Sequence, residues 1–427
     1  MGAKIGLRGL QDDSDSFGRS EMSRRLMRIL KVSQAYHPFL AAGGPPTKIR
    51  AIASRLVQHG HQVTVLTADL GLRANGNFPA KSRRERWGWV NEDKGVEAIY
   101  LQTLARYRAL TVNPGVVGFC REKLGLFAVA HVYGLYDLLG PQVARSCSDW
   151  KMPYVIEPMG MHRPIVRNLL LKKLYHKLFG HRLMREARFI IATSEQERRE
   201  LVADGIAETR IVVRRNGIET PEQVPEFGQF RKELGIAADA RLVLFLGRLV
   251  PKKSPDILIP AFARWRENAG KATQAVLVLA GPEEDAEYAR KLRQECAELR
   301  VGEEVRFTGA LYGERKWRAY RDADVFVLPS QNENFGNTAG ESAACGTPSI
   351  VTDQCGISAW IEGRAGVVAR CDVQAIENAL GMMLSHPALR EKYQEGCARV
   401  TRELSWNEPV AQMESIYRQC VEENAPR

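Results

Sequence analysis

Short apolar runs alternate with amphipathic stretches along most of the 427-residue chain. The apolar runs predict strands at 28–33, 62–67, 126–131, 154–157, 189–192 and 211–213 in the first half, and at 242–246, 275–279, 304–308, 325–328, 349–351 and 366–369 in the second. Strands that alternate with helical segments are typical of parallel sheets covered by helices on both faces. The pattern therefore predicts two doubly wound, Rossmann-like α/β units.

A polar, proline-containing stretch at 216–225 separates the two units and predicts a linker. We assign residues 27–220 to a first domain and residues 221–405 to a second domain. Residues 1–26 carry an acidic and polar cluster without the charged-then-apolar order of a signal peptide, which predicts a disordered tail. Because strand ends from both domains face the cleft between them, that cleft is the expected ligand site.

The composition excludes several classes of protein. No apolar run approaches the roughly 18 residues that a membrane span requires, so an integral membrane protein is not expected. Eight cysteines without a C-x-x-C pair predict reduced thiols in a cytoplasmic protein and argue against structural zinc. The net charge of +11 and the pI of about 9.3 favour anionic partners.

Two carboxylates stand out in the second half. Glu333 lies in a glycine-containing loop after the apolar run 325–328, and Glu341 lies in the alanine-rich helical stretch that follows. If that helix begins near Asn337, its free backbone N–H groups attract a phosphate, and Glu341 leans back toward them from one turn further on. The two carboxylates then accept hydrogen bonds from hydroxyl groups of one ligand. An exposed loop glutamate and a favourable helix dipole explain the same pattern without a ligand.

A second signal follows the strand predicted at 242–246. Gly247 allows a sharp turn off the strand, and Arg248 and Lys253 follow in a short loop at the carboxyl edge of the sheet. Two cations at this edge neutralise a departing diphosphate. A solvated basic loop is the alternative explanation. The position of Glu333 and Glu341 at the same edge favours the ligand site.

At these residues the chain resembles the retaining glycosyltransferases of family 4, also called group 1 glycosyltransferases, which have the two-domain GT-B fold. The resemblance rests on Gly247-Arg248 with Lys253, on the segment 324–348 that contains Glu333 and Glu341, on Ser194-Glu195 and on Asn216-Gly217-Ile218, and it spans about residue 27 to the C-terminus. It implies a hexosyl- or N-acetylhexosaminyltransferase that uses a UDP- or GDP-sugar donor and retains the anomeric configuration. The implied acceptor is a hydroxyl of a lipid-linked or polysaccharide-building molecule, and no cofactor is expected.

The resemblance also implies roles for single residues. Arg248 and Lys253 match the pair that binds the donor diphosphate, Glu341 matches the carboxylate on the ribose, and Glu333 matches the one against the donor sugar. Further implied donor-site residues are Gly43 and Gly44 in a first-domain glycine loop, Gly247, the base-contacting loop from Gly309 to Leu311, and the cradle Asn334, Phe335, Gly336, Asn337 and Thr338. Pro45 and Pro46 depart from the family pattern beside the glycine loop. Residues 406–424 are similar to the C-terminal helix that crosses back to the first domain.

Three residues are predicted on the acceptor side. His131 ends the strand predicted at 126–131, and a polar residue there is expected to point at the cleft. It resembles the family histidine near the reacting sugar, so we predict it to be catalytic, together with Arg248, Lys253 and Glu333; a buried structural histidine is the alternative. Glu157 and Gly160 follow the next strand and are predicted to line the acceptor pocket.

No metal is expected. Asp322-Ala323-Asp324 has the Asp-x-Asp form that holds a divalent metal in the other large glycosyltransferase fold, but it leads into a strand as a solvated boundary. The resemblance implies that Arg248 and Lys253 neutralise the leaving group in place of a metal ion.

The segment 163–188 is predicted to contact a partner. On a helix, the apolar stripe Val166, Leu170, Leu174 and Leu178 runs beside the basic stripe Lys173, Lys177, His181 and Arg185. This pattern suits peripheral contact with an anionic membrane, at the inner membrane face. It equally suits a helix whose apolar stripe packs on the sheet, and both interpretations stay open. The chain carries no nucleic-acid-binding pattern, so nucleic acid is not an expected partner.

Two other functions are compatible with parts of the sequence. A non-catalytic nucleotide-sugar-binding protein needs the same donor motifs. An NAD(P)-dependent oxidoreductase shares doubly wound sheets, but no G-x-G-x-x-G follows the strand predicted at 28–33. The glycosyltransferase is the favoured function.

Overall fold

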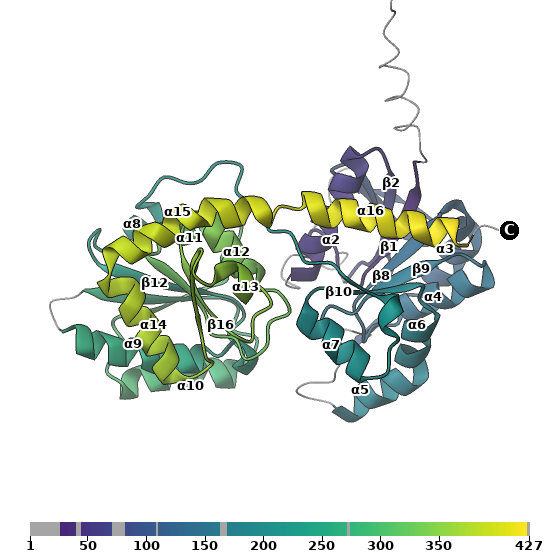
Figure 1. The fold of residues 1–427 in the computed structure, drawn as a ribbon. Helices are drawn as coiled ribbons and strands as arrows, with labels where there is room; N and C mark the ends of the chain where they lie inside the picture. The colour runs from purple at the N-terminus through teal and green to yellow at the C-terminus, as the bar shows by residue number, and fades with distance from the viewer. Residues whose placement is uncertain are drawn as a thin grey trace, which may run out of the picture.

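The computed structural model describes residues 26–39, 44–70, 82–107, 110–162, 169–270 and 274–424, which form two α/β halves (Figure 1). Among these residues, nine strands of the first half form one sheet in the order β11-β10-β9-β8-β1-β2-β5-β4-β3. Their bounds are β1 (Arg28–Val32), β2 (Gln62–Ala68), β3 (Arg83–Arg84), β4 (Gly88–Asp93), β5 (Val96–Leu101), β8 (Val129–Tyr133), β9 (Tyr154–Glu157), β10 (Phe189–Ala192) and β11 (Ile211–Val213). The strands from β11 to β5 are parallel, and β4 and β3 add an antiparallel edge.

Helices cover both faces of the first sheet. The helices of this half are α2 (Gly44–Gln58), α3 (Gly115–Lys123), η2 (Leu124–Leu126), α4 (Leu139–Asp149), α5 (Leu169–Tyr175), the π-helix η3 (His176–Gly180), α6 (His181–Glu186), α7 (Glu195–Ala203) and η4 (Glu208–Arg210). Apolar residues of α3, α4 and α6 fill one face, and those of α2 fill the other. A separate hairpin, β6 (Ala105–Tyr107) and β7 (Leu110–Val112), stands beside the sheet.

The second sheet is parallel throughout. Its order is β14-β13-β12-β15-β16-β17, with the bounds β12 (Arg241–Leu246), β13 (Ala275–Ala280), β14 (Val305–Gly309), β15 (Val325–Leu328), β16 (Ser349–Thr352) and β17 (Gly366–Ala369). Its helices are α8 (Gln229–Leu234), η5 (Pro251–Lys253), α9 (Pro255–Ala269), α10 (Ala286–Glu298), α11 (Gly313–Asp322), α12 (Asn337–Ala344), α13 (Ser358–Ile361), α14 (Val373–Ser385) and α15 (Pro387–Glu403). Central strands such as β12 are continuously apolar because both faces are covered.

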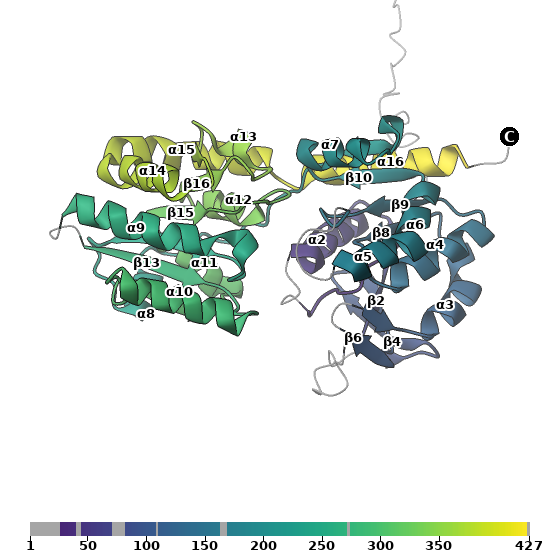
Figure 2. The same ribbon diagram turned by 90° about the horizontal axis from the view of Figure 1, so that it is seen from below.

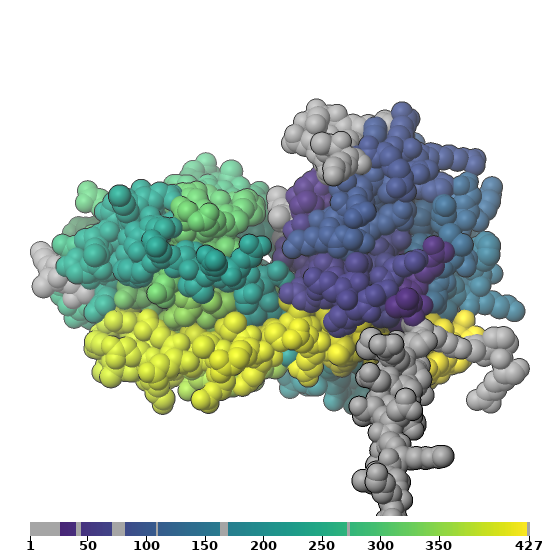
Figure 3. All heavy atoms as spheres, turned by 90° about the horizontal axis from the view of Figure 1, so that it is seen from above, coloured from purple at the N-terminus to yellow at the C-terminus, as the bar shows by residue number. Residues whose placement is uncertain are grey.

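The last helix, α16 (Asn407–Glu422), belongs to the first half by its contacts. It follows α15 of the second half, and Figures 1 and 3 show the two helices running along one side of both halves; Figure 2 shows the same arrangement from below. Val410, Met413 and Tyr417 are buried in the same apolar cluster as Ile29 of β1 and Val129 of β8. The end of the chain therefore completes the core of the first half.

The fold class predicted from the sequence is confirmed, but two regions differ from the prediction. Residues 83–112 form β3 to β7, which the sequence analysis did not predict; β3, β6 and β7 have only two or three residues each, whereas β5 is a largely buried strand that was overlooked. The strand predicted at 126–131 is β8 (Val129–Tyr133), because Leu126 ends the short helix η2. Among the described residues, no helix has both the length and the apolar character that a membrane span requires.

Candidate active site

Loops at the carboxyl edge of the second sheet carry the predicted diphosphate-binding cations. Gly247 follows β12, and its N–H donates to the carbonyl oxygen of Ala280 at 2.9 Å. A Cβ atom at Gly281 would lie 1.7 Å from the Gly247 carbonyl oxygen, so this close approach of two loops requires glycine. Arg248 follows Gly247 and is half exposed, with its guanidinium 3.4 Å from Glu284. It is therefore accessible from the cleft edge.

Lys253 and Glu333 lie together at this edge. Lys253 ends η5, and its ammonium group forms an ion pair with the Glu333 carboxylate. The backbone fixes both residues, because the Gln331 N–H donates to the Lys252 carbonyl at 3.0 Å and the Glu333 N–H donates to the Gln354 carbonyl at 2.9 Å. The structure thus brings together a cation and a carboxylate that are 80 residues apart in the sequence.

Helix α12 begins at Asn337, as the sequence predicted. Gly336 precedes it with a φ of 104°, a backbone conformation that favours glycine. Glu341 lies one turn into the helix and is nearly buried. Lys316 donates to its Oε1 at 2.9 Å, and Tyr320 donates to its Oε2 at 3.1 Å. Sequence analysis did not predict these two partners. Their spacing of four residues places both side chains on one face of α11, which is the signal that could have indicated them.

The remaining predicted donor-site residues lie along the same edge. The Phe335 side chain is buried in the core of the second half, and the centroid of its ring lies 5.9 Å from that of Trp360. Gly309 ends β14 with a φ of 70°, and the Leu311 side chain is buried in the core of the second half. Thr338 is partly buried in the first turn of α12.

The two halves meet at a polar seam that includes Asn334. Its Nδ2 donates to Thr193 Oγ1 at 3.3 Å and to Glu197 Oε2 at 3.4 Å, both in the first half. Glu197 also accepts the Gly160 N–H at 2.6 Å, and burial raises the pKa of its carboxyl group. A Cβ atom at Gly160 would lie 2.3 Å from Asn334 Oδ1, so Gly160 is a packing position at the seam.

The helices α2 and α12 approach each other through their N-terminal residues. The Cβ position of Gly44, the first residue of α2, is 3.9 Å from Asn337 Nδ2. Asn216 of the linker donates to Asn337 Oδ1 at 3.3 Å. Two helix N-termini that approach each other concentrate positive potential between them. Gly43, also predicted in this loop, lies outside the described residues.

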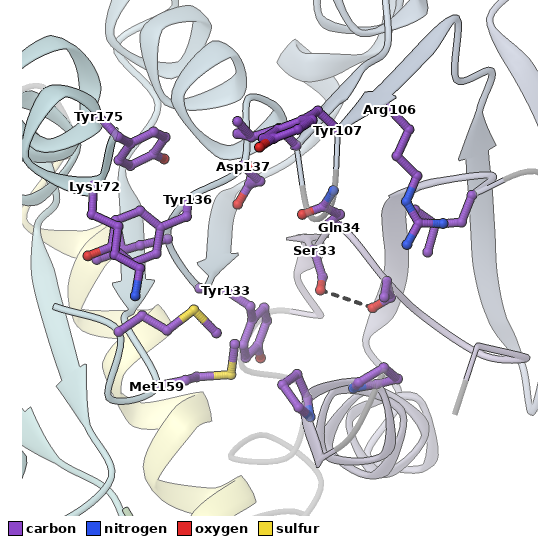
Figure 4. A pocket seen from close by; sticks show the side chains of 18 of the residues that line it. Ser33, Gln34, Arg106, Tyr107, Tyr133, Tyr136, Asp137, Met159, Lys172 and Tyr175 are labelled. Atoms are coloured by element: carbon purple, nitrogen blue, oxygen red, sulfur yellow. Dashed lines mark hydrogen bonds between the residues drawn. The ribbon is translucent and has the colours of Figure 1, made fainter. Parts of the chain in front are cut away.

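A cavity of about 490 Å³ opens in the first half, at the carboxyl ends of its parallel strands (Figure 4). Its lining comes from the residues after β1, β2 and β9, from the last residue of β8 and the residues after it, from the start of α2, from the hairpin β6–β7 and from α5. Much of this lining is apolar or aromatic, including Leu135, Tyr136, Met159 and Met161, whereas Arg106 and Lys172 contribute cations. Sequence analysis missed this set of residues, because they come from segments far apart in the sequence, between Ser33 and Tyr175.

The prediction that His131 ends its strand and points at the cleft was wrong. His131 is the middle residue of β8 and is fully buried. Its Nδ1 lies 2.6 Å from the Tyr417 hydroxyl, and its ring stacks on Tyr133 with centroids 3.9 Å apart. Burial, with Lys31 and Arg214 nearby, lowers the pKa of His131 well below its ordinary value. Tyr133, two residues further along the strand, lines the cavity instead.

The prediction that Glu157 lines the acceptor pocket was also wrong. Its carboxylate is fully buried and pairs with Lys48 of α2 and, at 2.7 Å, with Arg214. Burial alone would raise the pKa of Glu157, but Arg214 and Lys48 lower it below its ordinary value. Glu157 therefore holds α2 and the residue after β11 against the end of β9.

Asp322 and Asp324 have structural partners, contrary to the prediction of a solvated boundary. The buried Asp322 carboxylate accepts the N–H groups of Gly228, Phe230 and Arg231, and Asp324 pairs with Arg231 at 2.8 Å. In the described part of the chain, no group of three or more histidine, cysteine, aspartate or glutamate side chains is placed to hold a metal ion.

Two protein-family models match the chain. "Glycosyl transferase 4-like domain" matches residues 43–217, and "Glycosyl transferases group 1" matches residues 226–399. A "D-inositol 3-phosphate glycosyltransferase" of Streptosporangium roseum is 30% identical over 92% of this chain and 93% of that protein. A protein of the same name from Thermomonospora curvata is 32% identical over 53% of this chain and 56% of that protein. One from Geodermatophilus obscurus is 33% identical over 56% of this chain and 54% of that protein. These two alignments span about half the length of the relatives.

Solved structures with the same fold cover nearly the whole chain. Anabaena Alr3699/HepE in complex with UDP and glucose superposes with a TM-score of 0.71 at 17% identity, over 92% of this chain and 100% of that one. The catalytic domain of starch synthase IV from Arabidopsis thaliana, bound to ADP and acarbose, gives a TM-score of 0.73 at 15% identity, over 93% and 100%. The fold is therefore GT-B. The chain belongs to the group 1 glycosyltransferases, also called glycosyltransferase family 4.

Proposed function

We propose that this glycosyltransferase transfers a hexosyl or N-acetylhexosaminyl group from a UDP- or GDP-sugar, with retention of configuration and without a metal ion. The observation that carries the proposal is the Lys253–Glu333 pair beside Arg248, at the sheet edge where α12 begins. In this proposal residues 221–405 bind the donor, and residues 27–220, completed by 406–424, bind a lipid-linked or polysaccharide-building acceptor. The structural neighbours solved with UDP and glucose and with ADP and acarbose support a nucleotide-sugar donor.

Each group at the edge has a role in the proposed reaction. Cleavage of the glycosidic bond leaves negative charge on the diphosphate, which Arg248, Lys253 and the N-terminus of α12 stabilise. Glu333 accepts hydrogen bonds from hydroxyl groups of the donor sugar once the ammonium group of Lys253 turns to the diphosphate. Glu341, fixed by Lys316 and Tyr320, accepts from the ribose hydroxyls. The seam at Asn334 brings the acceptor-binding half against the donor.

The test is a transfer assay with the Glu333→Ala and Arg248→Ala variants. The donor is first found by screening UDP- and GDP-sugars for slow hydrolysis by the purified protein. We expect each variant to lose about 100-fold or more in transfer rate, since each lacks a group that acts on the reacting charges. Arg370→Ala, an exposed arginine of the same half, is the matched control and should keep the wild-type rate. Wild-type rates in both site variants would contradict the proposal.

We further propose that the enzyme is a cytoplasmic protein that binds an anionic membrane surface through α5 and η3. Five large apolar side chains of this segment are between 37% and 84% exposed: Leu170, Leu171, Leu174, Leu178 and Phe179. The interpretation in which the leucine stripe packs on the sheet is therefore wrong for the described leucines; Val166 lies outside the described residues. Tyr175, Leu183 and Met184 pack inward instead.

The charge of this segment supports an anionic partner surface. Lys173, Lys177 and Arg185 are exposed beside the leucines, and residues 158–185 contain no aspartate or glutamate. Exposed apolar side chains beside cations insert at the boundary between headgroups and acyl chains of anionic bilayers. Leu171 and Lys172 of α5 also line the cavity, so an acceptor held in the membrane lies next to its binding site.

Vesicle sedimentation tests this surface. Wild-type protein should bind phosphatidylglycerol-rich vesicles, less so at high salt, and should bind phosphatidylcholine vesicles weakly. The double variant Leu174→Gln and Leu178→Gln should lose this binding. The control Leu299→Gln changes an exposed leucine of the other half and should bind as wild type. Equal binding by the double variant would overturn the assignment.

A further inference from the structure

A cluster of buried polar side chains lies directly beneath the cavity of the first half. Lys31, in β1, is fully buried, and its ammonium group donates to the Tyr133 hydroxyl at 2.7 Å and to the Tyr417 hydroxyl at 3.2 Å. Tyr417 also bonds to His131 Nδ1 at 2.6 Å. Lys31 and His131 are register partners on the adjacent strands β1 and β8. The cluster thus spans β1 and β8 on the face of the sheet that α16 covers.

The cluster joins two distant parts of the molecule. Tyr133 ends β8 and lines the cavity, where its ring lies near Met159 (Figure 4). Tyr417 lies in α16, which comes directly from the second half through α15. A single lysine therefore bonds both to the wall of the cavity and to the helix that crosses between the halves.

Burying the Lys31 ammonium group costs desolvation free energy. Burial, with Arg214 and Lys48 nearby, lowers the pKa of Lys31 well below its ordinary value. An apolar residue in the middle of a central strand would avoid this desolvation. The His131 Nε2 is buried without a hydrogen-bond partner as well. Polar groups held in this way specify one arrangement of the tyrosine rings around them.

We propose that Lys31 and Tyr417 are positioning residues that couple the acceptor cavity to α16. Lys31 holds the Tyr133 hydroxyl away from the cavity, so that the flat face of the ring borders an acceptor's sugar or apolar chain. The docking of α16 supplies the second hydroxyl that fixes Lys31. A correctly shaped acceptor site then requires the crossover helix to be in place. This inference rests on the proposed function for the identity of the acceptor site, but the coupling itself is independent of transfer.

Hydrogen exchange with a defined probe tests the coupling. The probe is octyl β-D-glucoside below its micelle concentration, an amphiphile with a sugar headgroup and an apolar chain. In the wild type, its binding should slow amide exchange in residues 413–420 of α16. Tyr417→Phe removes one hydroxyl and keeps the ring, so it should abolish this slowing and raise the dissociation constant of the probe about fivefold.

Kinetics supply the second measurement. Tyr417→Phe should raise the KM for the acceptor while leaving the KM for the donor and the rate of donor hydrolysis unchanged. Lys31→Met should act in the same direction and more strongly. Tyr393→Phe, a tyrosine of α15 in the other half, is the matched control and should change neither measurement.

The outcomes separate the two proposals. Absence of transfer by the wild type with every UDP- and GDP-sugar contradicts the proposed function, while the exchange experiment still decides the coupling. Unchanged probe binding and unchanged protection of α16 in Tyr417→Phe overturn the coupling, whatever the transfer rate. If Lys31→Met does not fold, the result with Tyr417→Phe decides alone.

Discussion

Two lysine–glutamate pairs of this molecule have the same chemistry and different surroundings. Lys253 and Glu333 lie at the cleft edge of the second half, with side chains 16% and 21% exposed. Lys48 and Glu157 lie inside the first half, with side chains 4% and 0% exposed. Water can replace either partner in the first pair, whereas in the second pair only the protein can compensate a lost charge.

The buried pair is part of a larger arrangement. Arg214 adds a second cation to Glu157, and burial lowers the pKa of Lys48 to about 8. The cleft pair is less buried, and among the described residues Glu333 forms no second ion pair, so its members can exchange each other for a ligand. The comparison indicates that a charged motif at a strand end becomes a ligand site only where it keeps access to solvent.

The largest expected effect is on stability, in the Glu157→Gln variant. It leaves Lys48 and Arg214 buried without a carboxylate, which should destabilise the protein by about 3–5 kcal/mol. Urea unfolding at pH 7 measures this loss. Because the folded-state pKa of Glu157 lies below its ordinary value, its contribution is complete at neutral pH and disappears only as the pH falls through that lowered pKa. Glu333→Gln, the matched change in the cleft pair, should unfold almost as the wild type does.

In the cleft pair, the Lys253→Ala variant should lose activity and keep its stability. We expect transfer to fall about 10²–10³-fold, because the leaving diphosphate loses a cation. Stability should change by no more than about 0.5 kcal/mol, since the pair is partly solvated. The control Lys291→Ala removes an exposed lysine from an ion pair in the same half and should change neither quantity. A large stability loss in Lys253→Ala would remove the distinction between the two pairs.

Asp137 sharpens the comparison, because it is a buried carboxylate paired with backbone N–H groups. Burial raises its pKa to about 6, although the N–H groups of Gly140 and Leu139 oppose this. The folded state therefore binds more protons than the unfolded state between about pH 4 and 6, and stability falls as the pH rises through that range. In Asp137→Asn this fall, of about 1–3 kcal/mol, should disappear. Urea unfolding at pH 4.5 and pH 7 measures it, and an unchanged pH dependence would contradict the assignment.

The smallest effect is expected at the seam. Asn334→Ala removes the hydrogen bonds to Thr193 and Glu197, which should weaken the contact between the halves by about 0.5–1.5 kcal/mol. Small-angle X-ray scattering should report a larger radius of gyration, and transfer should slow several-fold. Asn268→Ala removes a bond from an exposed asparagine to Glu377 and serves as the control. An unchanged radius would show that Asn334 does not hold the halves together.

The sequence predicted the buried parallel strands well. The bounds of β9, β10, β11, β15 and β17 agree with the predicted ranges, and α12 begins at the predicted residue. β9, β10 and β15 are buried at every position, so their apolar runs end where the strands end, whereas β11 and β17 are partly exposed edge strands. Among the strands at 83–112, β3, β6 and β7 are too short to give such a run, whereas β5 is a largely buried strand between β2 and β4 that the sequence analysis overlooked.

The site was predictable only where neighbours in the sequence are also neighbours in space. The motif from Glu333 to Glu341 is local, and it lies at one sheet edge with Arg248 and Lys253. The surroundings of His131 depend on α16, about 280 residues further along the chain. Periodicity likewise predicted the leucine stripe of α5 and η3. It could not predict whether another element covers the stripe, because that depends on residues far away in the sequence.

The crossing of α16 also constrains the order in which the protein folds during synthesis. Domains made first generally fold first, as they leave the ribosome. Here the apolar cluster that includes Ile29 and Val129 is completed by Val410, Met413 and Tyr417, which are translated after the whole second half. The first half therefore emerges with α2 covering only part of one face of its sheet, and it acquires its final stability only after nearly 200 further residues have been added.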